Sequence, residues 1–226
     1  MSNIYLIRHG FTPANNANYN GQKGMRTIAE DKDMPLEKKY GRKQAEELGL
    51  FLNTIEGKTL ILVSPYNRTR ETLDIALSHM KGDYDIEVCD DIHEISAGIH
   101  YARTKSEVLE LSKNAEKFYK EFEKNPYETK YIGGESYYDV RDRVKNISNK
   151  ILSISKSNIY DNIFIVAHGE VNRWIYYNIN NKLYDIKQKN CEVLLISDEN
   201  VKSVFVPNTF VPKGYIINVD DYKNKN

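Results

Sequence analysis

The stretch Ile4-Tyr5-Leu6-Ile7-Arg8-His9-Gly10 stands near the start of the 226-residue chain. A run of apolar residues that stops at a polar motif is typical of a strand buried in a parallel sheet and feeding a loop. Two later stretches repeat the pattern: residues 60–63 (Leu-Ile-Leu-Val) precede Ser64-Pro65, and residues 163–167 (Ile-Phe-Ile-Val-Ala) precede His168-Gly169. We therefore expect three buried strands, each ending at a chemically distinctive loop.

Helical patterns separate these strands. Apolar residues recur at helical spacing in four places, namely Ala45, Leu48, Leu52 and Ile55; Leu73, Ala76 and Met80; Leu111, Ala115, Phe118 and Phe122; and Val140, Val144, Ile147, Ile151 and Ile154. The last set predicts one amphipathic helix over about 135–156, opening near Gly133-Gly134. Further strands are expected near 192–197 and 202–206. Alternation of strands and helices predicts a three-layer α/β/α sandwich with a mainly parallel central sheet.

The length suits one domain that buries a full core. We predict a single domain over 1–226 with a small helical lobe, or insertion, at about 95–132. The polar stretch 15–35 is expected to be a long loop, and about 221–226 a frayed end.

Composition excludes several classes of protein. Thirty-two Lys and Arg balance 32 Asp and Glu, so no global field favours nucleic acid or anionic lipid. Cys89 and Cys191 lack the paired spacing of a zinc or redox motif and are expected to be reduced thiols. The sequence also shows neither a signal-like start nor a long apolar run. We expect a cytoplasmic protein that binds neither membrane nor nucleic acid, while its oligomeric state stays open.

The chemistry is expected where the strands end, because ligands of open parallel sheets collect at the carboxyl ends of the strands. Arg8 and His9 follow the first strand, Arg68 lies just past the second, and His168 follows the third. Two guanidinium groups and two imidazoles form a pocket for a dianion, because arginine matches phosphate oxygens with a planar charged fork. Neighbouring arginines also favour a neutral imidazole, which is a competent nucleophile.

These motifs resemble those of the histidine phosphatase superfamily, which includes the cofactor-dependent phosphoglycerate mutases. The resemblance covers most of the chain in family order, from residue 4 to about 173. It rests on Leu6-Ile7-Arg8-His9-Gly10, Ser64-Pro65-Tyr66-Asn67-Arg68, Glu94-Ile95-Ser96-Ala97-Gly98, Gly133-Gly134-Glu135-Ser136 and Ala167-His168-Gly169-Glu170. Pro35-Leu36 and Gly41-Arg42-Lys43-Gln44-Ala45 are similar to the entrance of the family's first helix.

The resemblance implies a mechanism. His9 would attack phosphorus and become phosphohistidine, and Glu94 would give a proton to the leaving oxygen and then help to activate water. The transferring oxygens would be held by Arg8, Asn15, Arg68 and His168, with Thr12 and Gly169 as further phosphate-binding candidates. Fixed arginines can supply the charge neutralisation that a metal supplies elsewhere, so we expect no metal and no cofactor.

Several of these assignments have rivals. Asn16 competes with Asn15, and Arg70 with Arg68. Thr12 contacts the phosphate or only caps the local backbone. His100, Arg103 and Lys105 are further candidates for contacts with the distal part of the substrate, although solvated surface is the expectation for each.

Two departures from the mutases favour hydrolysis. Mutases usually carry another arginine shortly after the position of Asn15, where this chain has Tyr19-Asn20-Gly21, and a long basic insertion after the acid/base element, where only about forty residues separate Glu94 from Gly133. We expect a phosphatase acting on a small phosphorylated metabolite. The alternatives are a mutase and, in a different class, a non-catalytic phosphate-binding or interaction module. The substrate itself is not encoded in any motif.

Overall fold

The structure is a computed structural model that describes residues 1–16, 32–101, 103–197, 200–215 and 217. Its described strands form one sheet of six, in the order β3-β2-β4-β1-β5-β6. They are β1 (Asn3–Arg8), β2 (Thr59–Val63), β3 (Tyr84–Val88), β4 (Asn162–Ala167), β5 (Val193–Ser197) and β6 (Asn200–Phe205). The pairs β1–β4, β4–β2 and β2–β3 are parallel, whereas β5 is antiparallel to β1 and β6. The prediction of a mainly parallel sheet is confirmed.

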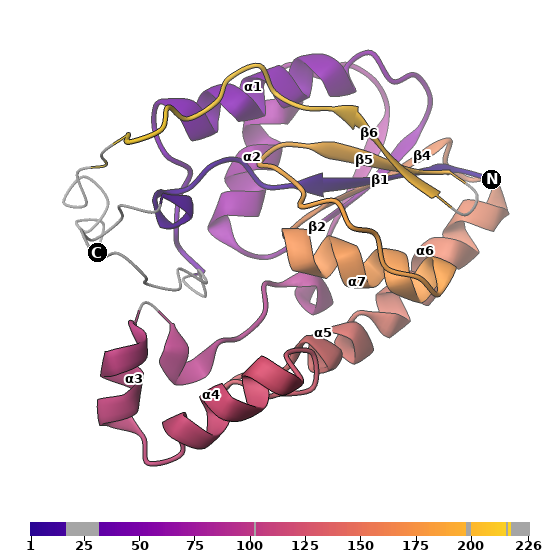
Figure 1. The fold of residues 1–226 in the computed structure, drawn as a ribbon. Coiled ribbons are helices and arrows are strands. Elements are labelled where there is room, and N and C mark those ends of the chain that lie inside the picture. Colours follow the sequence, from indigo (N-terminus) through magenta and orange to yellow (C-terminus); the bar gives the residue numbers. More distant parts are fainter. Residues whose placement is uncertain (17–31, 102, 198–199, 216, 218–226) are drawn as a thin grey trace.

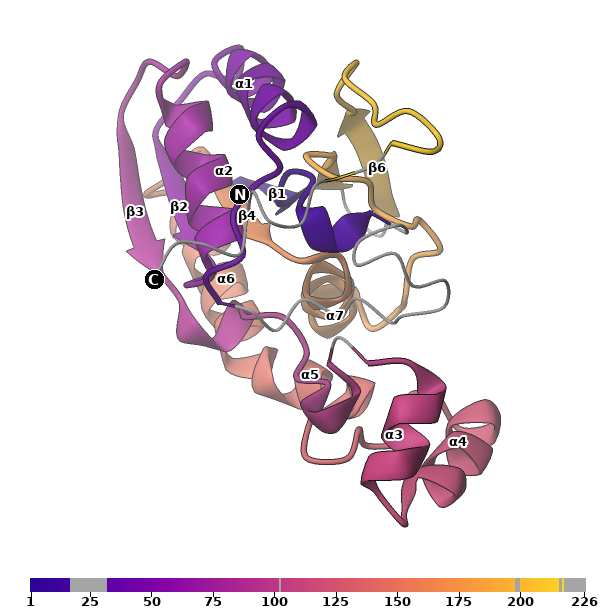
Figure 2. The ribbon, with the colours of Figure 1, turned by 90° about the vertical axis from the view of Figure 1, so that its left-hand side faces the viewer.

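Helices cover both faces of this sheet (Figures 1 and 2). On one face, α1 (Tyr40–Leu52) and α2 (Asn67–Leu77) bury their apolar stripes against residues such as Ile7 and Ile61. On the other face, α6 (Lys145–Ser157) and α7 (Gly169–Asn180) enclose a second cluster that includes Leu6 and Ile165. Successive residues of a strand point to opposite faces, so each buried strand feeds both cores, and the three-layer prediction is confirmed.

Three shorter helices complete the described part of the chain. The short helix α5 (Tyr137–Arg143) precedes α6, and α3 (Lys105–Leu111) and α4 (Ala115–Lys124) project beyond the sheet (Figure 1). α3 and α4 lie in the region, about 95–132, for which a helical lobe is predicted. The expected end at 221–226 and most of the expected loop at 15–35 lie outside the described residues. The single-domain organisation stays a prediction.

The structure differs from the sequence expectations in local detail. The expected helix over 135–156 is two helices, α5 and α6, joined at Val144, whose ψ of 1° leaves the helical range. Leu111 ends α3 instead of sharing a helix with Phe118. Side-chain spacing alone does not reveal such breaks, because the apolar stripe continues across them. Edge strand β3 was missed since its side chains are mostly exposed and the run lacks a buried pattern.

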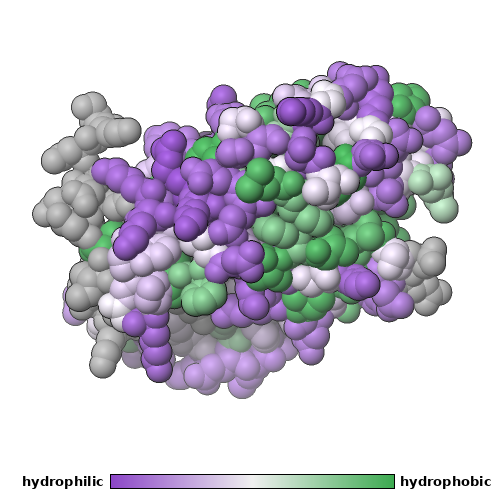
Figure 3. Space-filling model, turned by 90° about the horizontal axis from the view of Figure 1, so that it is seen from above, coloured by the Kyte–Doolittle hydropathy of each residue, from purple (hydrophilic) through white to green (hydrophobic). Residues whose placement is uncertain are grey.

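The face that carries α1 and β6 combines a polar end with an apolar area (Figure 3). There the rings of Phe51 and Phe205 stack with their centroids 4.7 Å apart, next to Leu50, which is 58% exposed. No helix in the described part of the chain is long and apolar enough to cross a membrane.

Candidate active site

The carboxyl ends of β1, β4 and β2 bring the predicted residues together. Arg8 pairs in register with Ala167, and Val63 with Val166, so the loops that follow these residues start side by side. The ring centroids of His9 and His168 are 5.3 Å apart. The Arg68 Nη2 donates a hydrogen bond to the Nδ1 of His168 at 3.3 Å. Residues from three distant parts of the sequence thus share one site.

Hydrogen bonds fix the protonation pattern of both imidazoles. The Nδ1 of His9 lies 2.8 Å from the carbonyl oxygen of Gly10. A carbonyl only accepts, so this nitrogen carries the proton and Nε2 keeps its lone pair. In His168, Nδ1 accepts from Arg68, so Nε2 carries the proton and donates to the hydroxyl of Ser64 at 3.0 Å. The ring nitrogen of His9 that keeps its lone pair is therefore Nε2.

Burial and positive charge keep both rings neutral. His9 is 3% exposed and His168 is fully buried. Desolvation lowers the pKa of His9 well below its usual value, and the charges of Arg68 and then Arg8 lower it further. The pKa of His168 is lowered in the same way, by desolvation first and then by Arg68. Both effects disfavour the imidazolium, in agreement with the expectation for a nucleophilic histidine.

Arg68 enters the site from the first turn of α2. The side chain is almost fully buried, and its guanidinium carbon lies 4.8 Å from the centroid of the Tyr66 ring. Its rival Arg70 is exposed on the same helix. The hydroxyl of Thr72, one turn later, accepts from the amide of Gly10 at 2.9 Å and so ties the His9 loop to α2.

Asn15 and Thr12 form a small network after the His9 loop. The Asn15 Oδ1 accepts from the amide and the hydroxyl of Thr12, both at 3.1 Å, and from the Nδ2 of Asn190 at 3.1 Å. With its oxygen engaged, the side chain of Asn15 has its amide protons as remaining hydrogen-bond donors. The Nδ2 of the rival Asn16 donates instead to the carbonyl of Tyr215. Thr12 is the N-cap residue of a short 3-10 helix, Pro13–Asn15, and its contact with phosphate stays a prediction.

Glu94 lies between the strand ends and the helical lobe. Its Oε2 is 3.6 Å from the Nδ1 of His168, and its Oε1 accepts from the amide of Ile95 at 3.0 Å. A potential proton donor thus stands beside the two imidazoles. The side chain is 17% exposed, so it is partly shielded and still accessible.

A brace that the sequence did not reveal holds the Glu94 segment. Arg143 donates to both carboxylate oxygens of Glu135, at 2.8 and 3.1 Å, and to the carbonyl of His93 at 3.1 Å. The Glu135 carboxylate accepts from the amide of Ser96 at 2.9 Å. Gly134 permits this approach, since a Cβ there would lie 2.3 Å from the Ser96 carbonyl oxygen. The only signal in the sequence was the Gly-Gly-Glu-Ser helix opening.

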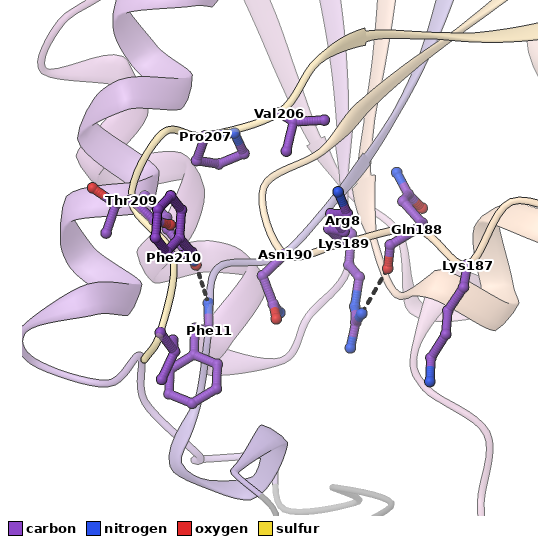
Figure 4. A pocket seen from close by; sticks show the side chains of 12 residues that line it. Arg8, Phe11, Lys187, Gln188, Lys189, Asn190, Val206, Pro207, Thr209 and Phe210 are labelled. Carbon is purple, nitrogen blue, oxygen red and sulfur yellow. Dashed lines mark hydrogen bonds between the residues drawn. The ribbon is translucent and has the colours of Figure 1, made fainter. Parts of the chain in front are cut away.

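Arg8 is anchored by a loop that precedes β5, which sequence reasoning also missed. Its Nη1 donates to the carbonyl of Gln188 at 2.7 Å, as Figure 4 shows. The Nε2 of Gln188 in turn donates to the carbonyls of Leu6 and Glu192, each at 2.9 Å. Arg8 and Gln188 line a cavity of about 740 Å³ that also contains Phe11 and Asn190 (Figure 4). The loop lacks any periodic pattern, so nothing in the sequence pointed to it.

The remaining candidate residues lie in different surroundings. Gly169 begins α7 and lies against Arg8, whose Cδ would be 3.7 Å from a Cβ at that position. Arg103 donates to the carbonyl of Ile99, and the Lys105 ammonium lies over the ring of Tyr119, both in the lobe. The expectation of solvated surface was wrong for His100, which is 2% exposed because its ring packs 4.2 Å from that of Phe118.

The site also contains three side chains that can bind a metal ion. One ligand atom each of His9, Glu94 and His168 lie within 4.8 Å of one another. Arg8 and Arg68 are close enough to lower the pKa of His9, and the same positive field opposes a cation and favours an anion. The geometry therefore suits phosphate better than a metal ion.

Comparisons with known proteins identify the family of the chain and similar folds. Residues 4–206 match the histidine phosphatase superfamily (branch 1), while no curated protein matches the sequence. The fold is similar to that of the alpha-ribazole phosphatase from Shigella flexneri, with a TM-score of 0.68 and 19% identity over 94% of this chain and 100% of that one.

Two further solved structures share the fold. The mycobacterial glucosyl-3-phosphoglycerate phosphatase has a TM-score of 0.62 and 17% identity, over 86% of this chain and 89% of that one. The phosphoglycerate mutase from Bacillus anthracis has a TM-score of 0.59 and 20% identity, over 91% of this chain and 92% of that one. The family match spans most of the sequence. The chain belongs to branch 1 of the histidine phosphatase superfamily.

Proposed function

We propose that the protein hydrolyses the phosphomonoester of a small metabolite through a phosphohistidine at His9. The observation that carries the proposal is the meeting of Arg8, Arg68, His168 and Glu94 around an imidazole whose Nε2 keeps its lone pair. Phosphoryl transfer needs mainly positioning and charge neutralisation, and this set of side chains supplies both.

The first step forms a bond between His9 Nε2 and phosphorus while the ester P–O bond breaks. Glu94 gives its proton to the departing oxygen, so the leaving group departs as an alcohol. Arg8, Arg68 and the Asn15 amide stabilise the charge that spreads over the equatorial oxygens. In the second step Glu94 takes a proton from water, the water oxygen attacks phosphorus, and the P–N bond breaks. Inorganic phosphate leaves and His9 is restored.

One observation favours hydrolysis over mutase chemistry. A mutase must grip a bisphosphate at both ends, which calls for cations beyond those that hold the first phosphate. The region after Glu94, where mutases have their basic insertion, here forms the short helices α3 and α4. The intact set of site residues argues in the same way against a non-catalytic binding module.

The direct test uses p-nitrophenyl phosphate in the presence of EDTA. We expect phosphate release, which would also demonstrate that no bound metal is needed. Rapid quenching with a radiolabelled substrate should give an acid-labile, alkali-stable label on wild-type enzyme and none on His9→Ala. Phosphate binding without turnover would support the binding module, and hydrolysis without labelled protein would refute the phosphohistidine route.

A second assay separates phosphatase from mutase. The enzyme is primed with a bisphosphoglycerate and supplied with 3-phosphoglycerate as acceptor. We expect release of inorganic phosphate to exceed formation of the isomeric phosphoglycerate, because water competes freely for the phosphohistidine. Preferential transfer to the acceptor would assign the mutase reaction instead.

A further inference from the structure

A second cavity, which we name the α7 cavity, opens beside the proposed proton donor. It has a volume of about 380 Å³, and its lining includes Arg8, Glu94 and Gly169 together with Glu170, Arg173 and Tyr184. It shares Arg8, Lys187 and Gln188 with the cavity of Figure 4, so these three residues form a common wall. A general acid must lie within hydrogen-bond reach of the oxygen that it protonates. The leaving group of a substrate is therefore expected on the side that Glu94 faces.

Besides the Nε of Arg8, three polar atoms of this lining are buried and lack a hydrogen-bond partner within the described part of the chain. They are Glu170 Oε2, Arg173 Nε and the hydroxyl of Tyr184. The Nη1 of Arg173 is 3.8 Å from Glu170 Oε2, too far for a hydrogen bond. Tyr184 is 7% exposed. Buried polar groups are nearly always paired, and such atoms around one cavity indicate a ligand with matching groups.

The three groups differ in what they offer. Arg173 can only donate, and a carboxylate oxygen of Glu170 accepts. Desolvation raises the pKa of the Tyr184 phenol above its usual value, and the nearby Glu170 raises it further, so the phenol keeps its proton and donates. A set with donors and an acceptor matches alcohol hydroxyls, which both donate and accept.

The charges of the lining exclude a second anionic group. Arg8, Arg173 and Lys187 contribute three positive charges, and Glu94, Glu170 and Asp185 contribute three carboxyl groups. Arg8 is already assigned to the phosphate. Without Arg8, the net charge of the lining around the distal part of the substrate is balanced or negative. This charge disfavours a further phosphate or carboxylate on the substrate.

The neighbourhood leaves room for a ring. A third cavity, also of about 380 Å³, shares Glu170 and Arg173 with the α7 cavity. It is lined by aromatic side chains that include Phe122 and Tyr127. The Nη2 of Arg173 donates to the hydroxyl of Tyr127 at 3.4 Å. Apolar and aromatic surface with a few placed polar groups is the usual composition of a site for a small organic molecule.

We propose that the α7 cavity binds a neutral, polyhydroxylated leaving group, a sugar or polyol, through Glu170, Arg173 and Tyr184. The inference rests on the proposed function, since it takes His9 as the nucleophile and Glu94 as the proton donor. It makes the protein a sugar- or polyol-phosphate phosphatase and assigns three specificity-determining residues on and after α7.

The test compares kcat/KM for glucose 6-phosphate, 3-phosphoglycerate and phenyl phosphate. Wild-type enzyme is expected to prefer glucose 6-phosphate over both others. Tyr184→Phe and Glu170→Gln should each lower the ratio of kcat/KM for glucose 6-phosphate to that for phenyl phosphate about tenfold or more, because a lost hydrogen bond to a substrate hydroxyl leaves its partner unpaired. The matched control is Tyr160→Phe. Tyr160 stands just before β4, and its hydroxyl donates to the carboxylate of Asp85. This variant should leave the ratio unchanged.

Two results would overturn the inference: a preference of the wild type for 3-phosphoglycerate, or an unchanged ratio in variants whose circular dichroism matches the wild type. The wild-type preference decides the matter even when a variant fails to fold. Hydrolysis of phenyl phosphate by the wild type distinguishes a failure of the proposed phosphatase activity from a failure of the α7 cavity assignment. Its complete absence would refute the proposed phosphatase, whereas its presence with an unchanged ratio would refute only the assignment of the α7 cavity.

Discussion

The strand-end site and the α7 cavity lie on two sides of Arg8 and Glu94 and differ in how their polar groups are paired. At the strand ends, both nitrogens of His168 are engaged, the Asn15 oxygen accepts three hydrogen bonds, and Arg8 is held through its Nη1 while its Nε has no partner in the described chain. In the α7 cavity, Glu170 and Tyr184 each have a buried polar atom without a partner in the described chain. Polar groups held by the protein itself suit one invariant ligand, the phosphate, whereas groups left open suit a particular leaving group.

The largest effect is expected at the centre of the strand-end site. His9→Ala removes the atom that forms the P–N bond, so kcat should fall by roughly ten-thousand-fold or more, measured with p-nitrophenyl phosphate. The thermal unfolding curve should stay cooperative, because the strands and both cores are unaltered. A folded His9→Ala protein with near wild-type turnover would place the nucleophile elsewhere.

Glu94 stands where the two regions meet, and its effect should depend on the leaving group. Glu94→Gln cannot donate a proton, so kcat/KM for an alkyl phosphate, which reports the steps up to departure of the leaving group, should fall by about a hundred- to ten-thousand-fold. The fall should be much smaller for p-nitrophenyl phosphate, since nitrophenolate leaves without a proton. Equal losses with both substrates would contradict the role of Glu94 as general acid.

Arg143 tests whether the brace behind Glu94 acts on catalysis. Arg143→Ala removes the hydrogen bonds to Glu135 and to the His93 carbonyl. We expect kcat/KM for an alkyl phosphate to fall about tenfold, with the same leaving-group dependence as Glu94→Gln, because a small displacement of a catalytic group is costly.

Two variants serve as controls for the brace. Arg141→Ala removes an arginine from the same helix, α5, that pairs with Asp142 at the surface, and it should leave kcat unchanged. Arg143→Lys should restore part of the activity. A loss in Arg143→Ala that is uniform across leaving groups would indicate a general structural defect and not a displaced Glu94.

The smallest effect concerns stability against acid. His9 and His168 have folded-state pKa values well below the ordinary value, so below about pH 6.5 the unfolded chain binds protons that the folded chain does not. Stability is therefore full above this pH and declines as the pH falls. For each of the two histidines, the free energy of unfolding should fall by about 1.4 kcal/mol between pH 7.5 and pH 5.5.

Urea unfolding at the two pH values measures this effect. His9→Gln should lose less stability on acidification than the wild type by about that amount, because glutamine does not titrate. An equal loss in both proteins would indicate that His9 is protonated in the folded state. That result would also remove the argument for a neutral nucleophile.

Much of the strand-end site was predictable because it follows local rules. An apolar run that stops at Arg8-His9 identifies both a buried strand and the place where its ligand binds. Arg68 and His168 follow the same rule at β2 and β4, and the structure places them together as expected. The brace through Arg143 and the anchor at Gln188 were not predictable, because each contact joins a side chain to a backbone group more than forty residues away.

The sequence by itself determined the fold class, the family and the residues that meet at the strand ends, since hydrophobic periodicity and short motifs are local properties of the chain. Only the tertiary structure decided which nitrogen of His9 keeps its lone pair, what holds Glu94 in place, and that Glu170, Arg173 and Tyr184 line one cavity. These features depend on distances between segments that are remote in the chain, and spacing along the sequence does not encode such distances.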